Sequence, residues 1–125
     1  TDSYEFLKIS YSAYNQYNQV VSEGYNLLQT APSIYRLSQS YPNPFTSGGT
    51  TVDFDMPATE RISMFILDIK GRVVRTLINN EERFGYQSIQ WDAKSDDGDD
   101  VSSGLYFYQI RSSNFNAVGK LVYVK

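Results

Sequence analysis

A cluster of aspartates in one short stretch is the part of this sequence whose residue types are best suited to chemistry: Asp92, Asp96, Asp97, Asp99 and Asp100. Carboxylate oxygens gathered in a loop are the ligands that calcium prefers, so Asp96, Asp97 and Asp99 are the candidates for a metal site. The EF-hand pattern also needs a glutamate that closes the loop, and residues 101–104 do not supply one. A solvated turn built on Asp97-Gly98 is therefore the favoured interpretation, and we predict no metal site.

Paired carboxylates also serve glycoside hydrolases, which hold two of them about 5 to 9.5 Å apart across a cleft. One loop on a small domain forms no cleft of that kind. The 125 residues include no cysteine and no histidine, which excludes Cys/His zinc sites, Ser-His-Asp and Cys-His nucleophiles, and haem ligation through histidine. We therefore predict that the protein is not an enzyme, with no catalytic residue and no cofactor.

The charge balance bears on the partners. Eleven Lys and Arg stand against 14 Asp and Glu, for a net charge of −3, and no basic stripe is present. Nucleic acids and anionic membranes both require clustered positive charge, so neither is predicted as a partner. The sequence has no run of about 18 apolar residues, and no membrane span is predicted.

The segment Tyr41-Pro42-Asn43-Pro44-Phe45, called the proline segment below, divides the chain into two parts. Its two prolines fix their own backbone and favour extended conformations in the residues before them, so that neither a helix nor a central strand is expected to run through. An interdomain linker is the ordinary interpretation of such a segment. The aromatic residues at both ends indicate instead that it packs against the domain that follows.

Residues 1–36 carry apolar side chains at steps of three, four or seven, mostly tyrosine, which favours an amphipathic helix. We predict this helix over residues 12–29, with Ser10 or Ser12 as its cap. The segment Glu5-Phe6-Leu7-Lys8-Ile9 also fits the start of a strand. The tyrosine stripe is interpreted as packing on the chain's own sheet, with a docking face for a neighbouring domain as the alternative.

After the proline segment the hydrophobic period changes to two, as in half-buried strands. Val52, Phe54 and Met56 share one face of a first strand, which Pro57 is expected to end. Residues 62–69 are apolar on both faces and predict a central strand covered on both sides. Further strands are predicted over residues 73–78, 85–92, 104–111 and 118–124, joined by a turn at Gly71, a polar loop at 79–83, the aspartate turn and a turn at 112–116.

Six strands with short connections and no helix between them predict a mainly β protein. A half-apolar antiparallel sheet must bury its face on another sheet, so the expected architecture is an antiparallel β-sandwich. The residues expected in its core are Trp91, Phe54, Ile66 and Tyr106.

Several of these segments follow one another in a characteristic order: the proline segment, Asp68-Ile69-Lys70-Gly71-Arg72-Val73-Val74, Trp91-Asp92, Asp97-Gly98, Val101-Ser102-Ser103-Gly104-Leu105-Tyr106-Phe107-Tyr108, and Lys120-Leu121-Val122-Tyr123-Val124-Lys125. In this order and spacing, over about residues 37–125, they resemble the type A C-terminal sorting domain of type IX secretion substrates. The chain departs from that family at Thr46-Ser47-Gly48-Gly49, where the family often has Asn-Pro. The resemblance implies an immunoglobulin-like fold, similar to the module of flagellar hook-capping proteins.

The resemblance also implies a function and a division of the chain. Residues 37–125 would form the sorting domain, and residues 1–36 an N-terminal extension or the end of a preceding region. The domain would direct a cargo fused upstream through the type IX secretion system, across the periplasm and outer membrane, to the cell surface or the medium. The implied partners are an outer-membrane secretion apparatus and a sortase-like protease that removes the domain or attaches it to the surface.

The recognition residues implied by the resemblance are Tyr41, Pro42, Asn43, Pro44, Gly71, Gly104, Tyr106, Lys120 and Lys125. Their residue types also allow a purely structural interpretation, since the glycines permit turns and lysines protect an edge strand from foreign strands. The alternative function is a non-catalytic adhesive or carbohydrate-binding module that uses exposed tyrosines for stacking. A last strand that ends the chain favours the C-terminal address.

Overall fold

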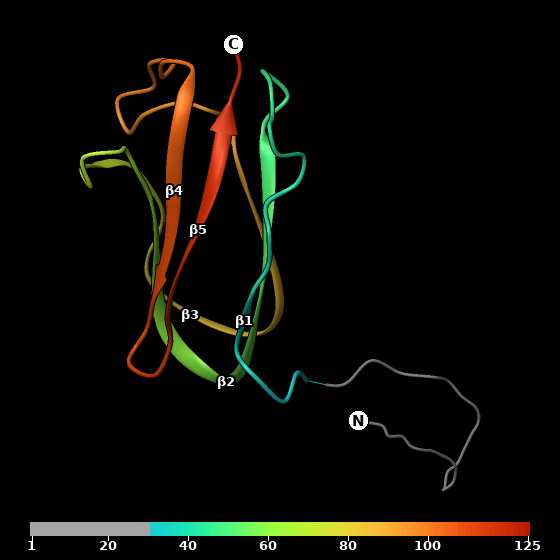
Figure 1. Ribbon diagram of the computed structural model, residues 1–125. Coiled ribbons are helices and arrows are strands. Elements are labelled where there is room, and N and C mark those ends of the chain that lie inside the picture. The colour runs from blue at the N-terminus through green and yellow to red at the C-terminus, as the bar shows by residue number, and fades with distance from the viewer. Residues whose placement is uncertain (1–30) are drawn as a thin grey trace, which may run out of the picture. The chain divides into compact units, whose positions relative to one another are not determined.

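The computed structural model describes residues 31–125, and within them all regular structure is β (Figure 1). The strands are β1 (Arg36–Leu37), β2 (Thr50–Leu67), β3 (Val73–Trp91), β4 (Gly104–Arg111) and β5 (Asn116–Tyr123). These described residues contain no helix long and apolar enough to cross a membrane. The helix predicted over residues 12–29 lies outside the described residues.

Two long strands, β2 and β3, build both layers of the fold. All strand pairs are antiparallel, in the order β1-β2-β4-β5, and β3 also pairs with β2. The first part of β2 pairs with β1 and the end of β3, and its second part pairs with β4 and the start of β3. One hydrogen-bonded network thus folds into two layers, and the predicted immunoglobulin-like antiparallel β-sandwich is confirmed.

The prediction that Pro57 ends its strand was wrong, because β2 continues through it to Leu67. The pairing register between β2 and β3 shifts between Met56 and Glu60, so Pro57 lies in an irregularity. A proline is tolerated there, because a bulged residue need not donate to the ladder.

The polar loop predicted at residues 79–83 is also wrong, because β3 runs without interruption from Val73 to Trp91. Asn80 has a φ of 52° and Gly85 a φ of 87°, so the strand contains backbone irregularities near its middle. Such irregularities bend a strand and increase its twist, which lets one strand serve both layers.

The predicted core is confirmed, since Trp91, Phe54, Ile66 and Tyr106 are all buried. The rings of Phe45 and Trp91 lie 5.7 Å apart, those of Trp91 and Tyr106 5.5 Å apart, and those of Phe45 and Tyr123 5.0 Å apart. Phe45 from the proline segment is therefore part of the core.

Residues 62–69 do not form the doubly covered strand that was predicted. Ile62, Met64 and Ile66 are buried, whereas Phe65 and Leu67 are half-buried. Ile69 lies beyond the strand end and is 70% exposed. The prediction was wrong because an apolar residue on the second face need not be covered by another layer. Phe65 on this face packs under the guanidinium of Arg111, which lies 5.5 Å from its ring centre.

Candidate recognition surface

The proline segment lies along the outer edge of β5, the last strand of its layer. The Phe45 N–H donates to the Val122 carbonyl at 2.9 Å, and the Val124 N–H donates to the Phe45 carbonyl at 2.9 Å. These two bonds form a parallel bridge between Phe45 and Tyr123. Backbone groups that an edge strand would otherwise leave unpaired are satisfied here by the chain itself.

Asn43 extends this cover with its side chain. The Val122 N–H donates to Asn43 Oδ1 at 2.9 Å, and Asn43 Nδ2 donates to the Lys120 carbonyl at 3.0 Å. Gln39 Nε2 also donates to the Lys120 carbonyl, at 3.3 Å. The carboxamide supplies one donor and one acceptor, and so imitates the backbone of a neighbouring strand.

Several contacts hold the proline segment in this position. Phe45 is 1% exposed in the core. Tyr41 and Thr51 exchange backbone hydrogen bonds of 2.8 and 2.9 Å, and Thr50 Oγ1 donates to the Pro42 carbonyl at 2.9 Å. The peptide bonds that precede Pro42 and Pro44 are both cis. The prediction that aromatic residues anchor both ends holds for Phe45, whereas Tyr41 remains 50% exposed.

The Tyr41 ring lies over the outer face of the layer that contains the first part of β2 and the end of β3. Its hydroxyl contacts both carboxylate oxygens of Asp53, at 3.1 and 3.0 Å, and this hydrogen bond raises the pKa of the phenol. Tyr41 therefore stays a neutral donor, and its side chain is half-exposed.

Lys120 and Lys125 are both exposed. Lys120 shares the outer face of β5 with Val118, 57% exposed, and Val124, 48% exposed. The backbone N–H of Lys125 donates to Ser103 Oγ at 2.9 Å, which holds the end of the chain beside the start of β4. Neither lysine forms an ion pair within residues 31–125, so both ammonium groups face solvent there.

The other predicted recognition residues do not join this surface. Gly71, with a φ of 82°, forms the tight turn between β2 and β3, and its N–H donates to the Asp68 carbonyl at 2.9 Å. Gly104 begins β4, and Tyr106 lies in the core with its hydroxyl bonded to the Ser102 carbonyl at 2.7 Å. The structure thus brings Asn43 and Lys120 together, whereas Tyr41 contacts Thr51 and Asp53 of β2. Gly71 and Tyr106 contribute to the fold.

The aspartate cluster is largely occupied by partners of its own. Asp96 Oδ1 accepts from the Thr76 N–H at 2.9 Å, and Asp92 lies 3.3 Å from Arg75. The Lys94 ammonium contacts Asp100 at 2.6 Å, and this hydrogen bond lowers the pKa of Asp100. Among the described residues no group of acidic side chains is placed to hold a metal ion. Asp97 and Asp99, the other candidate metal ligands, lie on the exposed side of the same turn.

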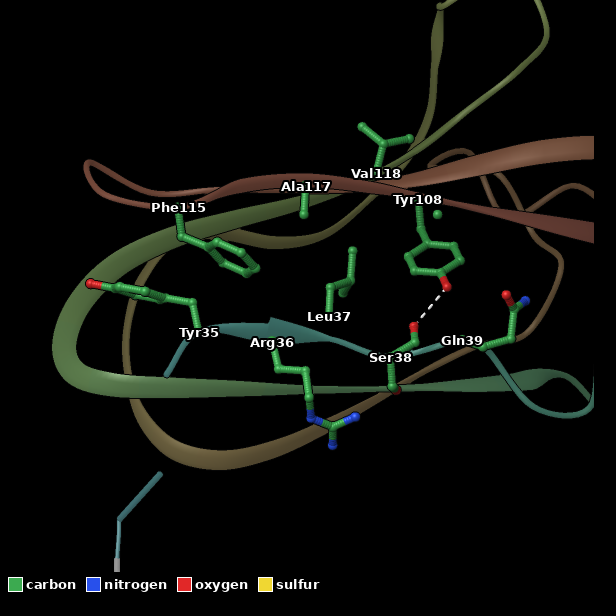
Figure 2. A pocket seen from close by; sticks show the side chains of 10 residues that line it. Tyr35, Arg36, Leu37, Ser38, Gln39, Tyr108, Phe115, Ala117 and Val118 are labelled. Carbon is green, nitrogen blue, oxygen red and sulfur yellow. Dashed lines mark hydrogen bonds between the residues drawn. The ribbon is translucent and has the colours of Figure 1, made fainter. Parts of the chain in front are cut away.

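A groove opens beside this surface, between β1 and β5, and has a volume of about 410 Å³ (Figure 2). One wall is formed by residues 35–39 and the other by residues 117–119, with Tyr108 and Phe115 between them. In Figure 2, Leu37 extends toward Ala117, and Tyr108 extends in the opposite direction with its hydroxyl toward Ser38. The rings of Tyr35 and Phe115 stack with centres 5.1 Å apart and close one end.

Tyr108 fixes the distance between the two walls. Its hydroxyl donates to the Ser38 carbonyl at 2.8 Å and accepts from the Ser40 N–H at 3.1 Å. Burial raises the pKa of this phenol, which keeps it protonated and able to donate. Its ring fills the space beside Gly119, where a Cβ would come within 2.1 Å of the Tyr108 Cζ.

Sequence reasoning did not find Gln39, Tyr108 or Gly119 as parts of this surface. The alternation of β4 placed Tyr108 on the inner face, but its hydroxyl partners come from a segment 70 residues earlier in the chain. A tyrosine opposite a glycine on the neighbouring strand is the available signal, and it becomes visible only once the register is known.

The fold and this surface define a small immunoglobulin-like β-sandwich whose last strand is bound by a preceding proline segment. Residues 39–125 match the family model described as the secretion system C-terminal sorting domain. The chain belongs to this family, and the predicted resemblance is confirmed. Domains of this family are generally non-catalytic sorting signals of type IX secretion, so residues 39–125 are a secretion-system sorting domain. Its destination is the cell surface or the medium, across the outer membrane.

Part of this chain is similar in sequence to two known proteins. The basal-body rod modification protein FlgD of Salmonella typhimurium is 41% identical over 63 residues, which are 50% of this chain and 27% of FlgD. The FlgD of Salmonella typhi matches over the same shares. This chain therefore spans about a quarter of the length of these relatives.

Two solved structures from Porphyromonas gingivalis have the same fold. PorZ, a surface component of the type IX secretion system, has a TM-score of 0.50 at 21% identity over 73% of this chain and 11% of PorZ. Dimeric latent PorU has a TM-score of 0.56 at 22% identity over 76% of this chain and 10% of PorU.

Proposed function

We propose that the recognised address is the folded surface formed by Asn43, Lys120 and Lys125 at the edge of β5, together with Tyr41 of the same proline segment. An outer-membrane secretion apparatus reads this surface and exports a cargo fused upstream. The observation that carries this proposal is the pair of hydrogen bonds between Asn43 and β5, one donated by Asn43 Nδ2 to the Lys120 carbonyl and one accepted by Asn43 Oδ1 from the Val122 N–H. These bonds join the proline segment to β5 in one surface. Lys120 and Val122 lie 77 and 79 residues after Asn43 in the chain. Short sequence motifs made of common residues carry little information alone, so recognition requires the folded domain.

In this proposal the module contributes no catalysis of its own, and a sortase-like protease processes it after passage. The exposed ammonium groups of Lys120 and Lys125 supply charge at the recognised edge, since neither is neutralised within the described residues. Exposed charges that face a complementary partner increase the rate and specificity of association. The domain division at residue 37, with residues 1–36 as an extension, forms part of the proposal. Ile34–Lys125 form one compact unit, and β1 begins at Arg36.

The test fuses residues 1–125 to a periplasmic reporter in a host with a type IX system. We expect the reporter at the outer surface or in the medium, and retention in the periplasm when residues 120–125 are deleted. The combined substitution Lys120→Ala and Lys125→Ala separates recognition from folding, because each exposed lysine should change stability by about 0.5 kcal/mol or less. We expect the folded double variant to be retained.

Export that is unchanged by both alterations, with the fusion shown to be folded by circular dichroism, would contradict the proposed address. The half-exposed Tyr41 on the outer face would then favour the alternative of a non-catalytic binding module.

A further inference from the structure

The edge of β5 is closed only in part. Val122 directs its N–H and C=O away from β4, toward Asn43 and Phe45. Alternate residues of an antiparallel strand direct these groups to the same side, so Val118 and Lys120 also direct theirs away from β4. Within residues 31–125, the N–H and C=O of Val118 and the N–H of Lys120 have no hydrogen-bond partner. We call these three groups the open half, and the groups bound by Asn43, Gln39 and Phe45 the closed half.

The open half borders the groove between β1 and β5. A strand that extended the β5 layer would place alternate side chains over this groove, whose lining includes Leu37, Phe115 and Ala117. Gly119 contributes no side chain to the wall, and the Tyr108 ring fills the space beside it. Backbone bonds to an open edge and pockets for alternate side chains are the two elements of recognition by strand addition.

We infer that an extended segment of the secretion apparatus adds to β5 alongside Val118 and Lys120, with an aliphatic side chain in the groove. An acidic residue beside Lys120 on the outer face completes the match, because opposite charges on neighbouring strands attract. This inference rests on the proposed function and names the contact by which the apparatus would read the edge.

A second copy of this chain fits the open half less well. Antiparallel pairing of two β5 strands about Val118 would set Lys120 opposite Asn116 of the other copy and would require the Lys120 carbonyl. Asn43 and Gln39 already occupy that carbonyl. A foreign segment can diverge from β5 at Lys120, whereas β5 of a second copy is held in place by its own β4.

The decisive substitution is Val118→Pro in the full chain fused to the reporter. Proline removes the N–H of the open half and leaves the β4–β5 ladder intact, because that N–H points away from β4. The matched control is Gln90→Pro on β3. Gln90 is paired with Thr51, whose own backbone bonds go to Tyr41, so the Gln90 N–H also points away from its neighbour. We expect export of Val118→Pro to fall by at least about tenfold, and export of Gln90→Pro to match the unmodified fusion.

A second measurement covers the case in which Val118→Pro fails to fold. Benzoylphenylalanine is placed at Val118 or, as control, at Phe84, which is 49% exposed on β3. We expect a photoadduct from position 118, absent from position 84 and absent in cells without the type IX apparatus. An adduct formed only with a second copy of the chain, or none, would overturn the inference.

The inference and the proposed function fail in different ways. If the unmodified fusion is exported and folded Val118→Pro is exported equally well, strand addition is wrong and the address stands. If the unmodified fusion itself remains in the periplasm, both are wrong.

Discussion

The closed and open halves of the β5 edge lie on one strand, a few residues apart, and differ in what satisfies their outward backbone groups. In the closed half, Phe45 and the Asn43 carboxamide replace a neighbouring strand. In the open half, an exposed Val118 stands beside the groove. Folded proteins protect such edges with charge, proline or cover, so the closed half is protected by cover and the open half only by the exposed Lys120.

The residue that covers most of the closed half, Phe45, also belongs to the core. Phe45 provides the backbone bonds to β5 and also packs its ring on Trp91 and Tyr123. The open half has no such coupling, because Val118 points to solvent. A change in the core should therefore loosen the closed half first.

The largest effect is expected from Trp91→Ala. Trp91 is 2% exposed and contacts Phe45 and Tyr106, so its removal leaves a large cavity. We expect a loss of about 3 to 5 kcal/mol in the free energy of unfolding, measured by urea titration. Amide hydrogen exchange should accelerate at Val122 and Val124 and change little at Val118, which is unprotected from the start. Equal protection of Val118 and Val122 in the unmodified chain would refute the distinction between the halves.

A smaller effect is expected from Asn43→Ala, which removes the bonds to Val122 and Lys120 without touching the core. Because solvent reaches this site, we expect a loss of about 1 kcal/mol, and fast exchange at the Val122 amide. Asn43→Asp is the matched control, since its carboxylate still accepts from Val122 but cannot donate to the Lys120 carbonyl. Slow exchange at Val122 in Asn43→Ala would show that the side chain does not close the edge.

Much of the fold was predictable because its signals are local. Alternation at Val52, Phe54 and Met56 fixed the inner face, and Gly71 marked a turn. The continuity of β2 through Pro57 was not predictable, because it depends on a register irregularity that only the partner strand defines.

The candidate surface was predictable in its residues but not in its arrangement. Asn43 and Lys120 were found through the ordered family pattern, while their hydrogen bond joins positions 77 residues apart. The open half could not be found at all, because nothing in Val118 itself shows whether another strand covers it. An edge is a property of the sheet topology, and local sequence contains no direct signal for it.

The smallest effect concerns the end of the groove, where Glu60 of β2 joins Tyr35, the residue before β1, to the turn after β4. Glu60 accepts hydrogen bonds from the Tyr35 hydroxyl and from Asn114 Nδ2, the latter at 3.2 Å. The bond from Tyr35 is the main cause that holds the pKa of Glu60 below its ordinary value. A carboxylate with a lowered pKa in the folded state stabilises the fold above its unfolded pKa, and this contribution is lost as the pH falls through the folded pKa.

We therefore expect Glu60→Gln to be less stable than the unmodified chain at pH 7, and the difference to shrink as the pH falls through the lowered pKa of Glu60. Below that pKa the unmodified Glu60 is protonated and resembles glutamine. Urea titrations at pH 7 and over a series of acidic pH values measure this, with Glu82→Gln as a control that changes the net charge equally at an exposed site 3.9 Å from Arg61. A difference between Glu60→Gln and the unmodified chain that stays constant with pH would mean that Glu60 acts by shape and not by charge. The Tyr35–Glu60 contact would then add no acid sensitivity to the groove.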